Sequence, residues 1–240
     1  MINFFLKVDD KIMKNKNVAG CVIIPAYHEE GRIGQVVRDV KEYIDCVVVV
    51  DDGSSDDTAK EATAAGAVVL EHKVNMGKGV ALENGFEWAY DNGYEFLITM
   101  DADGQHAAED LPKFLSVYAE GEYDILIGNR MWDSEDMPLV RRLTNKFMSW
   151  LLSRRMKQRV PDTQCGYRLY ACSAIKDIKC RSLRFNAESE ILLVLASRNK
   201  RIGSVPIKVI YNDEVSKINP VKDTFRFFRM LRKFRKEQKK

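Results

Sequence analysis

The sequence has little of what a secreted, metal-clustered or membrane-spanning protein needs. Its 240 residues include five cysteines, an odd number, and no C-x-x-C pair, so nothing indicates a disulfide framework or a zinc site. The three histidines are scattered along the chain. No stretch approaches the roughly 20 apolar residues that span a bilayer, and the opening apolar run is too short for a signal peptide. We therefore expect a cytoplasmic protein with reduced cysteines.

Charge is small in total but uneven along the chain. The net charge is +3, yet residues 217–240 hold ten Lys or Arg and two acids, which leaves 28 basic and 33 acidic residues before them. An acidic body thus carries a basic tail. Such a tail predicts an anionic surface as its neighbour.

Short apolar runs alternate with helical patterns in the first half of the chain. CVIIPAY (21–27) and CVVVVDD (46–52) are β-branched and unbroken, which is typical of strands buried on both faces. Further strands are expected at 67–72, 95–101 and 123–128, with helices at 33–44, 56–65, 77–92 and 108–120. Alternation of this kind predicts an α/β fold with a mainly parallel sheet flanked by helices.

The second half begins with a very basic helical pattern at 137–157. A loop leading into a strand is expected at 162–170, a helix near 187–199, a strand at 203–211 and a last helix near 221–236. Because no linker-like composition separates these parts, we expect one domain over 18–216 and a basic amphipathic extension over 217–240.

The last helix has an apolar side and a basic side. A helix with this division can lie in the headgroup layer of an anionic membrane, and the basic stretch 141–159, which contains Trp150, offers a second contact. The alternative is that the last helix packs on its own domain. No stacking platform or known module supports a nucleic-acid partner.

Three of the expected strands end in polar clusters, namely PAYHE (25–29), DDGS (51–54) and DADGQ (101–105). Ligands of parallel α/β sheets bind beyond the carboxyl ends of the strands, so we expect the three clusters to line one edge. Carboxylate and amide oxygens suit Mg²⁺ or Mn²⁺, which complete their shell with water and substrate phosphates. The alternatives are acids that only cap helices and a Ca²⁺ site, for which no loop has the spacing.

The sequence resembles the family 2 glycosyltransferases of GT-A (Rossmann-like) fold, close to dolichyl- or polyprenyl-phosphate mannosyl- and glucosyltransferases. Eight motifs in family order carry the resemblance from Val22 to about Pro220: VIIPAYHEE, VVVVDDGSSDDT, NMGKGVALENG, MDADGQH, IGNR, DTQCGYRLY, FNAESEI and SKINP. The resemblance implies nucleotide contacts by Pro25, Tyr27 and Glu29. It also implies that Asp52 binds the base and ribose with Val50 alongside, although a buried strand position explains Val50 equally well.

For the diphosphate, the resemblance implies a divalent cation held by Asp101, Asp103 and Gln105. Ala102 would lie against the nucleotide, and Arg130 would lie beside the diphosphate or the acceptor phosphate. Among these residues, Asp103 and Arg130 are the catalytic candidates.

In the acceptor half, the resemblance makes Arg168 a second phosphate clamp and a further catalytic candidate, with an ion pair to Asp162 as the alternative. Glu188 and Glu190 both match the family's glutamate, and Glu190 is taken as the catalytic candidate. Lys217 matches a mobile segment that closes over the donor.

Two positions limit the resemblance. The loop NMGKG lacks the full phosphate-loop pattern, so we predict no phosphate contact for Lys78 and interpret it as a surface residue. Mannosyltransferases of this group tend to carry an arginine where this chain has Tyr211, which weakens a mannose-specific assignment.

The resemblance thus implies an inverting, metal-dependent transfer of a mannose- or glucose-type sugar from a GDP- or UDP-linked donor to a polyprenyl or dolichyl phosphate, at the cytoplasmic face of a membrane. A phosphate acceptor is already anionic, so it needs alignment more than a base. A hydroxyl acceptor would need a base, for which Asp162, Glu188 and Glu190 are candidates. The rivals are a soluble transferase that uses a polysaccharide or protein acceptor, a nucleotidyltransferase, and a non-catalytic nucleotide-sugar-binding protein.

Overall fold

The computed structural model describes residues 19–132, 134, 137–178, 187–208, 210, 227–229, 231 and 232. Its centre is a seven-stranded sheet in the order β3-β2-β1-β4-β6-β5-β7. The strands are β1 (Gly20–Ala26), β2 (Cys46–Asp51), β3 (Val68–Glu71), β4 (Phe96–Thr99), β5 (Ile125–Asn129), β6 (Arg168–Ala171) and β7 (Ile202–Pro206).

Six of these strands run in one direction. β1 pairs in parallel with β2 and β4, β2 with β3, and β5 with β7. Only β6 is antiparallel to its neighbours β4 and β5. The predicted α/β class with a mainly parallel sheet is therefore confirmed.

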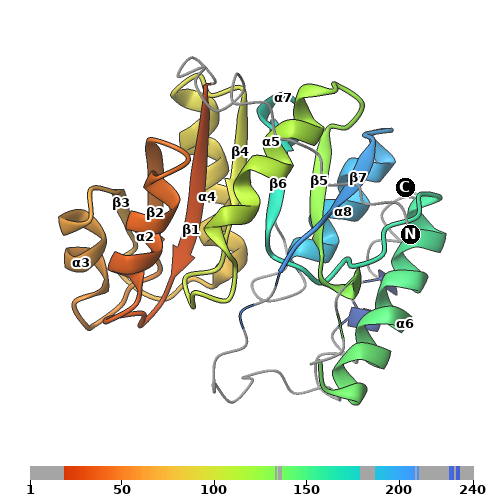
Figure 1. The fold of residues 1–240 in the computed structure, drawn as a ribbon, viewed down its shortest axis with the longest axis horizontal. Helices are drawn as coiled ribbons and strands as arrows, with labels where there is room; N and C mark the ends of the chain where they lie inside the picture. The colour runs from red at the N-terminus through yellow and green to blue at the C-terminus, as the bar shows by residue number, and fades with distance from the viewer. Residues whose placement is uncertain are drawn as a thin grey trace.

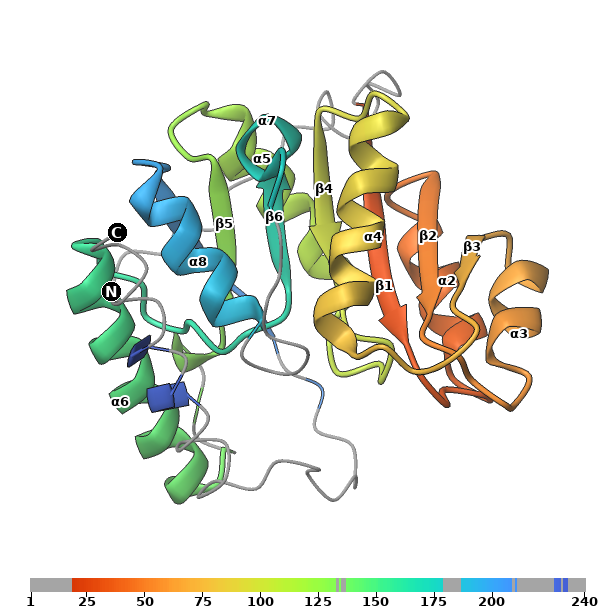
Figure 2. The ribbon, with the colours of Figure 1, turned by 180° about the vertical axis from the view of Figure 1, so that it is seen from behind.

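Helices cover both faces of the sheet (Figures 1 and 2). α2 (Ile33–Lys41) and α5 (Leu111–Ala119) lie on one face, whereas α4 (Lys78–Asp91) and α8 (Ala187–Ser197) lie on the other. α3 (Thr58–Ala64) packs beside β3, and α6 (Leu139–Met156) lies outside the β7 end of the sheet, where it contacts α8. The short helices are α7 (Cys172–Ile175), η1 (Ala108–Asp110) and η2 (Arg130–Trp132).

Apolar burial on both sheet faces explains the unbroken β-branched runs. Positions 21–24 of β1 and 48–50 of β2 are fully buried, as expected for strands that helices cover on both sides. On α4, Gly85 lets the helix approach the sheet, because a Cβ there would lie 2.4 Å from Ile23 Cγ2. The sequence patterns therefore predicted this half of the core.

The C-terminal segment is described at five positions, 227–229, 231 and 232. Phe227 and Leu231 are buried with the main hydrophobic core. Since they are four residues apart, this apolar side packs on the domain, as the alternative interpretation held. The rest of the expected helix at 221–236 lies outside the described residues, and the boundary between 18–216 and 217–240 stays a prediction.

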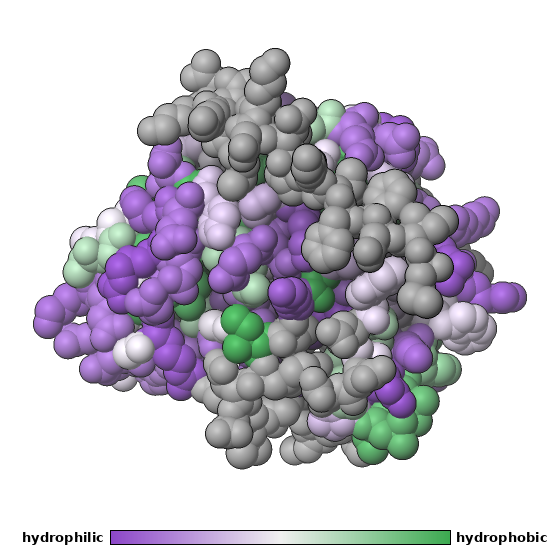
Figure 3. Space-filling view, in the orientation of Figure 1, coloured by the Kyte–Doolittle hydropathy of each residue, from purple (hydrophilic) through white to green (hydrophobic). Residues whose placement is uncertain are grey.

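The face of the molecule that Figure 3 shows is mainly hydrophilic at its described residues, and its largest apolar patch lies at the lower right, where α6 begins in Figure 1. Among the described residues, no helix is long and apolar enough to cross a bilayer.

Candidate active site

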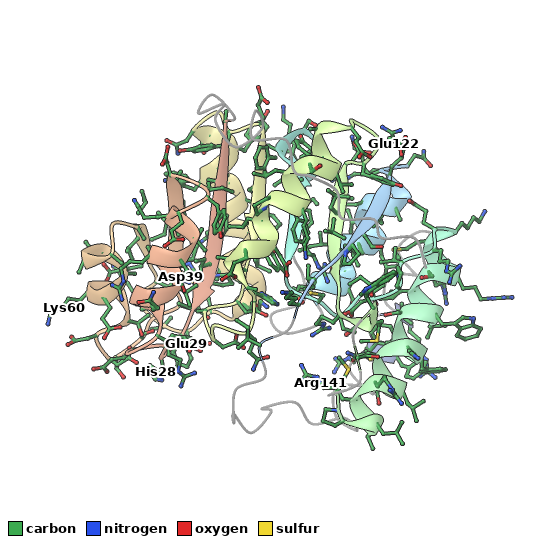
Figure 4. The ribbon with its side chains drawn as sticks, in the orientation of Figure 1. His28, Glu29, Asp39, Lys60, Glu122 and Arg141 are labelled. Atoms are coloured by element: carbon green, nitrogen blue, oxygen red, sulfur yellow. The ribbon has the colours of Figure 1, made fainter. Side chains whose placement is uncertain are left out.

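The carboxyl ends of β1, β2 and β4 lie at one edge of the sheet, where Figure 4 labels His28 and Glu29. Glu122 lies at the opposite edge. β2 and β3 lie on one side of β1 in the sheet, whereas β4, the next strand along the chain, lies on the other side. Parallel α/β sheets bind ligands at such a switch point, here between β1 and β4.

Asp101, just after β4, is the centre of a charged cluster. The Nζ of Lys78 lies 2.5 Å from Asp101 Oδ1 and 2.7 Å from Glu188 Oε1. Lys78 is the first residue of α4 and Glu188 the second of α8. Gly166 lets the main chain approach both acids, because a Cβ there would lie 2.9 Å from Asp101 Oδ2 and 3.1 Å from Glu188 Oε1.

Opposite charges set the protonation of this cluster. Burial alone would raise the pKa of Asp101, but the Lys78 ammonium, with a smaller effect of Arg130, lowers it below its usual range. Burial would lower the pKa of Lys78, yet Asp101 and Glu188 raise it. Near neutral pH Lys78 is therefore an ammonium and Asp101 a carboxylate.

The DADGQ loop turns back on itself behind Asp101. The Asp103 carboxylate accepts a hydrogen bond from the main-chain N–H of Gln105 at 3.0 Å. Burial and the nearby Asp101 charge raise the pKa of Asp103. His106 Nδ1 accepts the main-chain N–H of Asp101 at 3.1 Å, which requires a neutral ring, and burial lowers the pKa of His106 accordingly.

The donor set of this loop suits a hard cation only in part. Asp101 and Asp103 supply carboxylate oxygens, but among the described residues no three His, Cys, Asp or Glu side chains lie close enough to hold an ion. Mg²⁺ is commonly bound by one or two carboxylates together with substrate phosphates. The residues present therefore fit a cation that arrives with a phosphate ligand.

Arg130, in η2 after β5, is held by a bidentate ion pair. Its Nε lies 2.7 Å from Asp162 Oδ2 and its Nη2 lies 3.0 Å from Asp162 Oδ1. Burial would lower the pKa of Arg130, but Asp162 outweighs it and raises that pKa. The fixed guanidinium is close enough to Asp101 to lower the pKa of that carboxyl.

Asp52, at the end of β2, holds the loop that leads to Lys78. Its carboxylate accepts hydrogen bonds from the main-chain N–H groups of Met76 at 2.8 Å and Gly77 at 2.7 Å, and it contacts His72 Nδ1 at 2.7 Å. The other ring nitrogen of His72 contacts Asn84 Nδ2 at 2.8 Å. This network fixes the start of α4.

The model of the family described as "Glycosyl transferase family 2" matches residues 21–179, which is well over half of the chain. The chain belongs to glycosyl transferase family 2.

Several relatives of this transferase have names that specify a lipid phosphate as the acceptor. The UDP-N-acetylglucosamine–dolichyl-phosphate N-acetylglucosaminyltransferase of Methanococcus voltae is 31% identical over 215 residues, covering 80% of this chain and 86% of the relative. The dolichyl-phosphate hexose transferase of Haloferax volcanii is 34% identical over 202 residues, covering 83% and 86%.

Solved structures share the fold of the transferase. Glucosyl-3-phosphoglycerate synthase from Mycobacterium tuberculosis in complex with UDP superposes with a TM-score of 0.70 at 20% identity, over 87% of this chain and 77% of that chain. Its complex with Mg²⁺ and UDP gives a TM-score of 0.66 at 19% identity, over 86% and 76%. The fold is thus the GT-A fold.

Two site residues of the transferase differ from what the sequence indicated. Lys78 was interpreted as a surface residue, and this was wrong, because it lies between Asp101 and Glu188. Glu188 is the glutamate that contacts the cluster, whereas Glu190 is only partly buried. Side chains two positions apart on a helix point to different sides, so α8 directs one of the two glutamates to Lys78.

The structure places Arg168 inside the transferase and not at its surface. It is 0% exposed, and its guanidinium donates to the carbonyl oxygens of Cys165, Glu188 and Thr163 at 2.7, 2.8 and 2.9 Å. A phosphate cannot reach it in this arrangement, which contradicts the predicted clamp. The predicted alternative, a pair with Asp162, is also wrong, because Asp162 pairs with Arg130.

The remaining expected residues divide into four groups. Tyr27 is exposed at the edge and stacks on His28 with centroids 4.1 Å apart, while Ala102 and Val50 are buried. Pro25, Glu29 and Gln105 lie at the same edge in partly buried positions. Lys217 and Tyr211 lie outside the described residues.

Proposed function

We propose that this transferase moves a sugar from a UDP-linked donor to the phosphate of a polyprenyl or dolichyl lipid. The observation that carries the proposal is the Asp101–Lys78–Glu188 cluster at the carboxyl ends of the strands. It supplies the Asp101 carboxylate for a cation and the Lys78 ammonium for a phosphate. The names of the two relatives above support the lipid phosphate. UDP is part of one of those names, and both solved structures described above hold UDP.

On the donor side, the chain's own groups would hold the diphosphate. The Lys78 ammonium would exchange part of its contact with Asp101 for phosphate oxygens, and the N-terminal end of α4 adds main-chain N–H groups that favour an anion. Tyr27 and Glu29 would contact the nucleotide. Asp52 would act mainly by holding the loop before Lys78, since its oxygens already accept three contacts.

A divalent cation would be held by Asp101 and Asp103, with Gln105 beside them. When bound, such a cation neutralises charge that develops on the departing diphosphate. Arg130 would add to this stabilisation from a position that its pair with Asp162 fixes in advance.

On the acceptor side, the proposed nucleophile is a phosphate oxygen, which is anionic near neutral pH and needs no strong base. This agrees with the state of the candidate bases. Asp162 is fully buried and bound by Arg130, and Glu188 is bound to Lys78. Attack from the face opposite to the diphosphate would form the new C–O bond as the old one breaks, and so invert the anomeric carbon.

The test is a transfer assay with radiolabelled sugar donors and a short polyprenyl phosphate in detergent. We expect label in the lipid fraction from a UDP-sugar with Mg²⁺ or Mn²⁺, and a thermal shift by UDP that depends on the cation. Transfer from GDP-mannose alone would overturn the donor assignment. Transfer to soluble glycans or proteins but not to lipid would overturn the acceptor, and Glu188 would then be the candidate base.

A further inference from the structure

α6 exposes a continuous apolar stripe to solvent. We define the outer stripe as Leu139, Val140, Leu143, Phe147 and Trp150, whose exposures are 59%, 65%, 57%, 48% and 58%. Phe147 and Trp150 also stack on each other, with ring centroids 6.1 Å apart. Single exposed apolar side chains are ordinary, but a contiguous apolar surface marks a place where something binds.

The stripe has the geometry of one helix face. At 100° per residue its members fall within about 100° of one another. The opposite face is the buried one, and it is the more polar of the two, consisting of Asn145, Met148, Ser149, Leu152 and Met156. Packing against the domain therefore does not account for the apolar side chains of the stripe.

Positive charge borders the stripe. Between Pro138 and Pro161 the sequence has seven Lys or Arg and no acid. Five of the seven are exposed, namely Lys146, Arg154, Arg155, Lys157 and Arg159. Three acids, Asp133, Glu135 and Asp136, precede the helix, so the positive charge is greatest toward its C-terminal half.

The position of α6 in the fold connects its exposed surface with the candidate active site. Its inner face contacts α8, the helix that carries Glu188. Its N-terminal end lies at the end of the molecule to which β1, β4 and β5 point (Figure 1), and the apolar patch of Figure 3 lies there.

We propose that the outer stripe and its basic border dock α6 on an anionic phospholipid bilayer. Aromatic and aliphatic side chains would enter the headgroup boundary, and the basic side chains would contact lipid phosphates. The complementary charge favours this occupant over a second copy of the chain, whose stripe would bring like charges together. The inference goes beyond the proposed function, because docking needs neither donor nor transfer.

The C-terminal helix was the predicted membrane contact. In its described part, however, Phe227 and Leu231 are buried with the core. Its apolar side at these positions faces the domain, so α6 offers the larger described apolar surface bordered by basic residues.

The experiment is flotation of the full chain with phosphatidylcholine vesicles that contain either no anionic lipid or about 30% phosphatidylglycerol. We expect binding to the anionic vesicles, reduced about tenfold in Phe147→Ser/Trp150→Ser. Arg154→Gln/Lys157→Gln should weaken it about 25-fold, or about fivefold per charge. The matched controls, Val68→Ser/Tyr90→Ser and Lys60→Gln/Lys113→Gln, change accessible residues away from α6 and should bind like the unchanged chain.

A second readout locates the contact. The chain has three tryptophans, so Trp88→Phe/Trp132→Phe leaves Trp150 as the sole reporter, and its emission should shift to the blue on anionic vesicles. Three results would overturn the proposal: no binding by the unchanged chain, equal binding by stripe and control variants, or a dimer in solution that only the stripe variants convert to monomer. UDP thermal shifts and transfer in detergent are measured separately, so loss of docking is distinguishable from loss of the proposed function.

Discussion

Replacing Lys78 by Met tests whether the ammonium neutralises the two acids of the site. Methionine keeps an unbranched side chain but leaves Asp101 and Glu188 without their shared partner. Removing one member of a buried ion pair costs about 3–5 kcal/mol. Here the side chains of Lys78 and Asp101 are 23% and 31% exposed, so water screens part of the loss. We expect the free energy of unfolding at pH 7 to fall by about 2 kcal/mol.

The pH dependence gives this prediction its sign. Lys78 lowers the folded-state pKa of Asp101, so the pair stabilises the fold above the unfolded value of about 3.9 and loses this effect only as the pH falls through the lower folded pKa. In the variant the Lys78 ammonium no longer opposes the effect of burial, so the pKa of Asp101 should rise. Its protonation then relieves the unpaired charge, so the deficit relative to the unchanged chain should shrink between pH 7 and pH 4.

The assay is urea unfolding followed by circular dichroism at pH 7, 5.5 and 4. Lys60→Met is the matched control, because Lys60 pairs with Asp57 at 3.3 Å while 79% exposed, and an exposed pair contributes less than about 1 kcal/mol. Equal unfolding midpoints for the two variants at pH 7, or a Lys78→Met deficit that does not change with pH, would refute the electrostatic account of the cluster.

Three further predictions test the site. Gly166→Ala should lower kcat/KM about tenfold or more, because its Cβ would displace the Asp101 carboxylate and small misplacements are costly; unchanged kinetics would refute the close approach. Glu188→Gln should lower kcat at least about tenfold, whereas Glu190→Gln should change kcat less than about threefold. A larger loss of kcat in Glu190→Gln than in Glu188→Gln would show that Glu190 is the residue that matches the family's glutamate. Asp103→Asn should abolish the Mg²⁺-dependent part of the UDP thermal shift. EDTA should leave the melting temperature of the nucleotide-free protein unchanged, because its described residues hold no complete metal site. Stabilisation of the nucleotide-free protein by Mg²⁺ would contradict this expectation.

The predictable part of the fold depended on local patterns. β1 and β2 were predicted to within a residue or so, because each is a β-branched apolar run that ends at polar residues. α7 was missed, since four residues carry no helical period. The antiparallel direction of β6 was also not predicted, because it depends on how the chain returns between β4 and β5.

The site was less predictable wherever a role depends on partners distant in sequence. Lys78 finds its partners 23 and 110 positions away, and no local pattern contains them. The position of GKG at the start of a helix was the available signal. Arg168 shows the opposite error: a basic residue inside a family motif suggested a ligand contact, but its guanidinium stabilises the main chain around Cys165 and Glu188.

The positions of Lys78 and Glu188 in their helices explain how the site tolerates its acids before a donor arrives. Lys78 begins α4 and Glu188 is in the first turn of α8, so two helices on one face of the sheet begin beside Asp101. The N-terminal end of a helix carries about half a positive charge. These two ends and the Lys78 ammonium therefore offset the Asp101 and Glu188 carboxylates in the absence of a ligand. Under the proposed function, the same positive groups would contact a diphosphate once a cation took over the contact with Asp101, so one arrangement would serve both the empty and the loaded site.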